Sequence, residues 1–116
     1  MTGSQERPTP NTSTGWGNAT VTFDSTRTNI NVTITIKGLT GPPTGAHIHE
    51  KVTGTEVGGI VVSFTGTASF SGGKLTGAFP IDAAVAGRLA ATPANFYLNV
   101  HTAANGGGEI RGDLTP

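Results

Sequence analysis

Three histidines are the side chains in this sequence whose type and spacing suit metal binding. His47 and His49 stand one residue apart in the stretch GAHIHE, and His101 follows much later in NFYLNVHT. The chain has no cysteine and one methionine, which excludes thiolate zinc sites and sulfur-rich sites for Cu(I). Neutral imidazole binds copper, zinc and nickel well, and three imidazoles leave one coordination position open. The expected ion is therefore copper, as Cu(II), with zinc as the alternative.

The strands that must position these histidines are indicated by apolar residues at every second position. The clearest run is TNINVTITIKGL, in which β-branched apolar residues alternate with Asn, Thr and Lys. Its predicted inward residues are Ile30, Val32, Ile34 and Ile36. The stretch GNATVTFDS repeats the pattern upstream, and STRT supplies a turn between the two runs. Together these segments predict a β-hairpin.

The same alternation assigns all three histidines to one face. Ile48 is predicted to face the core, so His47 and His49 point to the other side. Val100 is also predicted to face the core, so His101 points outward as well. Residues i and i+2 of a strand lie roughly 6.5 to 7 Å apart and neighbouring strands about 4.8 Å apart, so the rings can reach one ion if the two strands are close. The alternative is that these are ordinary solvated residues on the outside of a strand.

Four further polar side chains are candidates for a supporting role around the histidines. Tyr97 and Asn99 share the face of His101 and can hydrogen-bond a ligand imidazole or a bound water, or can simply be solvated. Glu109 and Arg111 share a face in GEIRGD and can form an exposed ion pair, side by side or across strands with Glu50. Exposed pairs contribute roughly 0 to 1 kcal/mol, so a structural role is favoured for this pair.

The remaining segments predict further strands and one short helix. GGIVVSFTG predicts a strand, and SGGKLTGAFPI is expected to form a hairpin arm with FTGTASF or its neighbour. DAAVAGRLAATPA predicts one or two turns of helix between an N-cap at Asp82 and a stop at Pro93. NFYLNVHT and the segment after the NGGG turn predict a last hairpin. About seven or eight short strands favour an all-β, antiparallel Greek-key sandwich or barrel.

Length and charge narrow the classes of partner. The 116 residues predict a single domain over 1–116. Seven basic and seven acidic residues give no net charge, so neither nucleic acid nor an anionic membrane is an expected partner. No apolar stretch approaches the roughly 18 to 20 residues that span a bilayer. The opening MTGSQERPTP looks like an initiator methionine ahead of a mature domain, so we expect that an export signal has been removed.

Three blocks of the sequence, in this order, resemble the CHRD domain, a repeat named after chordin and found also in bacterial proteins. They are GSQERPTPNTSTGWGNATVTFD, GLTGPPTGAHIHE and FYLNVHTAANGGGEIRGDL. The resemblance implies an immunoglobulin-like or Greek-key β-fold in a secreted or periplasmic protein, and the family histidines map onto His47, His49 and His101. Chordin is a secreted antagonist of bone morphogenetic proteins, which implies a protein partner. Many members have Glu-Val-Pro-Pro near the start, where this chain has ERPTP.

A second resemblance concerns one strand only. GAHIHEKVTGT is similar to the strand of copper-zinc superoxide dismutase that carries a His-X-His pair for copper outside a Greek-key barrel. The bridging histidine and the zinc ligands of that family have no counterparts, because the chain has no further histidines. The resemblance therefore implies a mononuclear copper site in a superoxide-dismutase-like fold, without the full dismutase chemistry.

Three functions follow from these patterns. The first is an exported CHRD protein that binds copper, or zinc, through His47, His49 and His101 for metal carriage or buffering. The second is a metal-free module that holds a protein partner at its sheet edges or loops, as in chordin. The third and weakest is a mononuclear copper enzyme acting on superoxide or another small oxidant. No Ser-His-acid or paired-carboxylate arrangement follows from the spacing, so no catalytic residue is predicted, and the oligomeric state is left open.

Overall fold

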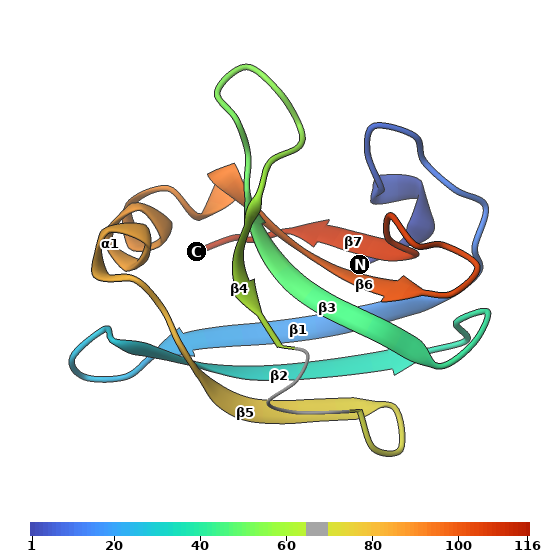
Figure 1. Cartoon of the computed structure of the whole chain (residues 1–116), viewed down its shortest axis with the longest axis horizontal. Coiled ribbons are helices and arrows are strands. Elements are labelled where there is room, and N and C mark those ends of the chain that lie inside the picture. Colours follow the sequence, from blue (N-terminus) through green and yellow to red (C-terminus); the bar gives the residue numbers. More distant parts are fainter. Residues whose placement is uncertain (65–69) are drawn as a thin grey trace.

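Two antiparallel sheets packed face to face form the protein, in a computed structural model that describes residues 1–64 and 70–116. Over these residues one sheet has the strand order β1-β2-β5 and the other the order β4-β3-β6-β7 (Figure 1). The strands are β1 (Trp16–Phe23), β2 (Asn29–Lys37), β3 (Pro43–Glu50), β4 (Ile60–Ser63), β5 (Lys74–Pro80), β6 (Phe96–Thr102) and β7 (Ile110–Asp113). The predicted all-β antiparallel fold is confirmed, as a sandwich rather than a closed barrel.

The core lies between the sheets and is built from the inward positions of each strand. β2 is the middle strand of its sheet, and its alternate residues are buried as the period of two predicted. They are Ile30, Val32, Ile34 and Ile36. β3, β4 and β6 contribute Ile48, Val62, Leu98 and Val100 from the other side. The predicted hairpin of β1 and β2 is confirmed, with Phe23 opposite Ile30 next to the turn.

The position of β5 differs from the expected hairpin with the segment before it. β5 pairs with β2, with Phe79 opposite Ile30, whereas β4 lies in the other sheet. Most of the expected partner FTGTASF, residues 65–69, lies outside the described residues. β5 pairs with β2 rather than with β4 because the edge of β2 opposite β1 can accept a further strand. In this position Leu75 and Phe79 of β5 extend the buried face of β2.

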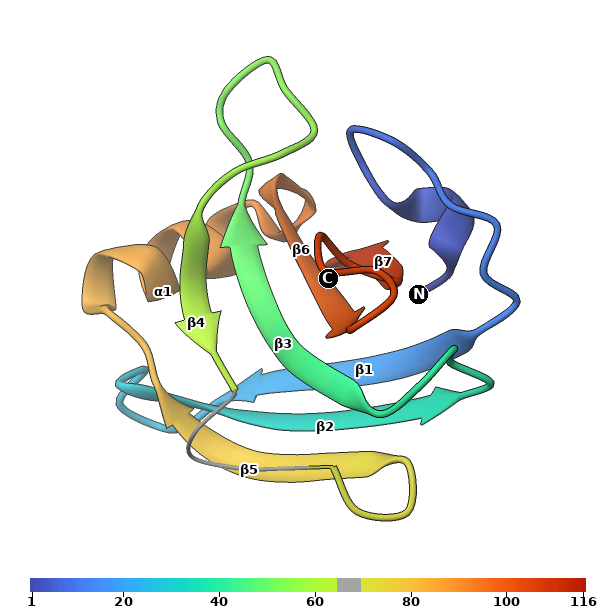
Figure 2. The ribbon, with the colours of Figure 1, turned by 45° about the vertical axis from the view of Figure 1, so that its right-hand side comes forward.

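The pairing of β3 with β6 is the feature that positions the histidines. These strands are neighbours in the β4-β3-β6-β7 sheet and run antiparallel, as Figure 2 shows. His47 lies opposite Asn99, His49 opposite Tyr97, and Gly45 opposite His101. The two strands that carry the histidines are therefore adjacent, as the predicted cluster required.

The α-helix α1 (Ala83–Ala91) covers one end of the sandwich (Figure 1). Asp82 is its N-cap, as predicted, and its carboxylate accepts hydrogen bonds from the backbone N–H groups of Ala84 and Val85. The helix is nine residues long, slightly more than the predicted one or two turns, and ends before the 3-10 helix η2 (Pro93–Asn95). A second 3-10 helix, η1 (Gly3–Gln5), lies near the N-terminus. Among the described residues no helix is long and apolar enough to cross a membrane.

Candidate metal centre

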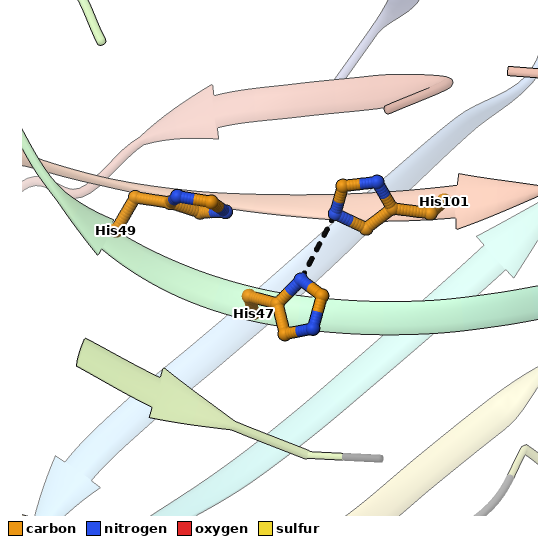
Figure 3. A group of neighbouring side chains, drawn as sticks. All are labelled: His47, His49 and His101. Atoms are coloured by element: carbon orange, nitrogen blue, oxygen red, sulfur yellow. Dashed lines mark hydrogen bonds between the residues drawn. The ribbon is translucent and has the colours of Figure 1, made fainter. Parts of the chain in front are cut away.

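The three histidines meet on the outer face of the β4-β3-β6-β7 sheet. One ring nitrogen from each lies within 4.8 Å of the others, and all three side chains are half-buried. Figure 3 shows the rings of His47 and His49 from β3 facing the ring of His101 from β6. They line a shallow hollow of about 340 Å³, to which Thr44 and Ile60 also contribute. The structure thus brings together the residues that the sequence predicted to converge.

The spacing of the nitrogens is close to that of ligands around one ion. His47 Nδ1 lies 3.0 Å from His101 Nε2, the contact marked in Figure 3. Two nitrogens bound at about 2.1 Å to the same metal are about 3.0 Å apart at a right angle and about 3.4 Å apart at a tetrahedral angle. Only small rotations of the side chains are therefore needed for His47 and His101 to share an ion.

Two backbone carbonyls determine which nitrogens face the cluster. Nδ1 of His49 lies 2.9 Å from the carbonyl oxygen of Gly58, and Nδ1 of His101 lies 3.0 Å from that of Gly106. A carbonyl only accepts hydrogen bonds, so each Nδ1 carries the proton and each neutral ring keeps its lone pair on Nε2. Ligand histidines in metal sites are oriented by the same kind of hydrogen bond from the second nitrogen.

Burial favours the neutral form of the His47 and His101 rings. Burial, with smaller contributions from the charges of His101 and His49, lowers the pKa of His47 to about 4. Burial also lowers the pKa of His101, although its hydrogen bond to Gly106 opposes the shift. Neutral imidazole is the form that binds a metal ion. His47 and His101 are therefore ready to coordinate at neutral pH.

Tyr97 and Asn99 both contact His49. The Tyr97 ring stacks on the His49 ring with 4.7 Å between centroids and an angle of 3° between the planes. Asn99 Oδ1 lies 3.1 Å from His49 Nε2. With the Nδ1 proton donated to Gly58, this contact is a hydrogen bond only in a ring that carries protons on both nitrogens. Asn99 therefore competes with a metal ion for this nitrogen. Both side chains are buried, so the solvated alternative does not hold.

Arg111 extends the stack to the next strand. Its guanidinium carbon lies 3.5 Å from the centre of the Tyr97 ring, so His49, Tyr97 and Arg111 form a layered row across β3, β6 and β7. Arg111 is only 1% exposed and donates a hydrogen bond to the backbone carbonyl of Glu56. Arg111 thus supports the site through Tyr97 rather than by touching a histidine.

The predicted exposed ion pair of Glu109 with Arg111, or across strands with Glu50, is wrong. Glu50 pairs instead with Arg88 of α1, at 2.7 Å. Arg111 lies near the carboxylates of Asp113 and Glu56. The reason is that residues 51–59, the loop between β3 and β4, and the N-terminal segment, residues 1–15, fold over the outer face of the sheet and bury Glu109 and Arg111.

Glu109 is a structural junction rather than part of the histidine cluster. It is 0% exposed, and its carboxylate accepts hydrogen bonds from three separate segments of the chain. The donors are Ser13 Oγ at 2.6 Å, Thr40 N at 2.9 Å, Thr40 Oγ1, Thr102 Oγ1 at 2.7 Å and Asn105 Nδ2 at 3.2 Å. Burial alone would raise the pKa of Glu109, but these hydrogen bonds outweigh it and lower the pKa to about 2.

Glu6 is a buried acid that the sequence did not single out. It is 3% exposed and belongs to the N-terminal segment, with its side chain beside Asn99 and Gly108. Burial raises the pKa of Glu6 to about 7, and Arg111 and Asn99 offset the shift only in part. No strand periodicity covers this part of the chain, so its burial had no local signal.

Glu6→Gln should make the protein more stable at pH 8 by about 3 kcal/mol. Between about pH 4.5 and 7 the folded protein keeps the proton on Glu6 while the unfolded chain has lost it, because the pKa rises from 4.5 to about 7 on folding. The free energy of unfolding of the wild type therefore falls across this range, and glutamine removes the fall. Urea unfolding at pH 4.5 and pH 8 measures the difference.

The matched control is Glu56→Gln, at a side chain that is 63% exposed. It should change stability equally little at both pH values. Equal stability of wild type and Glu6→Gln at pH 8 would show that the buried carboxylate has no raised pKa.

Comparison with known proteins adds the family. The family model of the CHRD domain matches residues 1–114, while no curated protein and no solved structure matches the chain. CHRD domains occur in secreted or extracellular proteins. The match includes both strands that carry the histidines. The chain belongs to the CHRD domain family.

Proposed function

We propose that this CHRD domain is a binding module that holds one copper ion, or alternatively zinc, through His47, His49 and His101. The observation that supports this is the convergence of three imidazole rings, two of which have their Nδ1 protons held by backbone carbonyls. His49 and His101 would bind through Nε2, and His47 through Nδ1. Such an ion would keep a fourth position for water or another small ligand.

Carriage or buffering of the metal is the role that the surroundings favour. The cluster lies in an open hollow at the surface, so an ion can enter and leave without unfolding of the sheet. The set of three imidazoles suits a divalent ion of intermediate softness and contains no sulfur ligand. Because CHRD domains occur in secreted or extracellular proteins, we place this activity in the periplasm or outside the cell.

The second candidate is a metal-free module of the chordin type. The family match favours a module that binds another protein, and it carries no information on metal. In this case the three histidines, Tyr97 and Arg111 would only stabilise the outer face of the sheet. A metal titration separates the two candidates.

Titration of the metal-free protein with Cu(II), and separately with Zn(II), should show one ion bound per chain. The expected Kd is about 1 μM or tighter, which corresponds to a binding free energy of about −8 kcal/mol or more favourable. Because the pKa values of His47 and His101 are lowered, protonation of these two ligands should weaken the affinity only at a pH well below the ordinary imidazole value of 6.5. Calorimetry at several pH values measures both. Binding weaker than about 10 μM for both ions would reject the metal function and leave the metal-free module.

A further inference from the structure

The first two residues bridge the edges of the two sheets. Met1 and Gly17 exchange hydrogen bonds, from the Met1 α-ammonium to the Gly17 oxygen at 2.8 Å and from the Gly17 N–H to the Met1 oxygen at 3.1 Å. Thr2 and Arg111 exchange two more, both at 3.0 Å. Met1 and Thr2 therefore connect the edge strand β1 to the edge strand β7, close to where Figure 2 marks the N-terminus.

Beside Met1 an open groove continues along the same line. It has a volume of about 460 Å³ and lies between β1, the end of the chain after β7, and α1. Apolar side chains form much of its lining, namely Ala19, Val21, Phe23, Leu89, Pro93 and Leu114. The groove shares no lining residue with the hollow at the histidines.

Both walls of the groove present backbone hydrogen-bonding groups. In an antiparallel strand the N–H and C=O of every second residue point to the same side. The N–H and C=O groups of Gly17 point to Met1, so the same groups of Ala19 and Val21 point into the groove. In the described part of the chain, β2 is the only strand that pairs with β1 at Ala19 and Val21. On the opposite wall, formed by β7, the N–H and C=O groups of Arg111 point to Thr2, so the same groups of Asp113 point into the groove.

We propose that this groove binds an extended peptide of a partner protein, which adds as a β-strand between β1 and β7. The peptide runs antiparallel to β1 and continues the ladder that Met1 and Thr2 begin. From Ala19 to Phe23 the open edge is about 13 Å long, enough for a peptide of four or five residues. Side chains opposite Ala19 and Val21 face the apolar floor, so alternating apolar and polar residues are required.

A tethered probe strand tests this slot directly. The segment Val-Thr-Val-Thr-Val-Thr is placed ahead of Met1, so that its last two valines fall opposite Ala19 and Val21. The tether holds the strand at an effective concentration of about 1 mM. The melting temperature should rise by about 5 °C. The amide hydrogens of Ala19, Val21 and Asp113 should exchange at least about tenfold more slowly.

The control is the same extension with proline in place of those two valines, because proline cannot donate the required hydrogen bonds. The proposal is overturned if the two extensions give the same melting temperature and the same amide exchange. It is also overturned if the protein without an extension forms dimers as its concentration rises and these three amides then exchange more slowly. The groove would in that case hold a second copy of the chain. Neither result bears on metal binding, which is measured separately at the histidines.

Discussion

His101→Ala should weaken Cu(II) binding at least about 100-fold, with little change in melting temperature. His101 is the ligand from β6, and without it His47 and His49 form a two-nitrogen site on one strand. The ring is half-buried at the surface and contributes no core packing, so the fold should persist. Competition with a chelator of known affinity measures the loss, and the visible spectrum of bound Cu(II) reports the change in its nitrogen ligands.

Lys74→Ala provides the control for this experiment. Lys74 is exposed and belongs to β5, in the other sheet, so its loss should leave copper affinity unchanged. If His101→Ala binds copper as tightly as the wild type, the ion is held elsewhere and the proposed site is incorrect.

Glu109→Ala should destabilise the protein by about 4 kcal/mol and lower the melting temperature by at least about 15 °C. The carboxylate joins the N-terminal segment, the turn between β2 and β3, and the β6–β7 hairpin through hydrogen bonds to Ser13, Thr40 and Thr102. Alanine leaves the buried Thr102 hydroxyl and the partly buried donors of Ser13 and Thr40 without this acceptor, and a buried donor without a partner costs about 1–3 kcal/mol. Urea unfolding at pH 7 measures the change.

Glu56→Ala, at an exposed glutamate, is the matched control and should lower the free energy of unfolding by less than about 1 kcal/mol. The pH dependence gives a second test. Folding lowers the pKa of Glu109 from 4.5 to about 2, so its stabilising contribution is complete above pH 4.5 and is lost as the pH falls to about 2. Glu109→Ala should lack this part of the acid destabilisation. A loss of stability no larger than that of Glu56→Ala would contradict the role of Glu109 as a junction.

The strands and the convergence of the histidines were predictable because both follow from the period of two. The alternation in β2 identified its buried residues, and the alternation in β3 and β6 placed His47, His49 and His101 on one face. That β3 and β6 are neighbours did not follow from the sequence, since pairing between distant strands has no local pattern. The partner of β5 was missed for the same reason.

The charged residues were mispredicted because their surroundings come from loops. Glu109 and Arg111 read as exposed in a strand that alternates, and Glu6 lies in a segment without periodicity. All three are buried because the N-terminal segment and the loop of residues 51–59 pack onto the outer face. Charged side chains are buried only when they find partners, and those partners lie far away along the chain, as Ser13 lies 96 residues from Glu109.

The backbone carbonyls that accept hydrogen bonds from His49 and His101 belong to two glycines, Gly58 and Gly106. These glycines differ in how freely they can be replaced. A Cβ atom at Gly58 would lie 1.6 Å from the Glu50 oxygen, so that position accepts only glycine. A Cβ atom at Gly106 would meet nothing within 4 Å, and any residue there still offers the same carbonyl to His101. A combinatorial library aimed at tuning metal selectivity should therefore vary position 106 and leave position 58 unaltered.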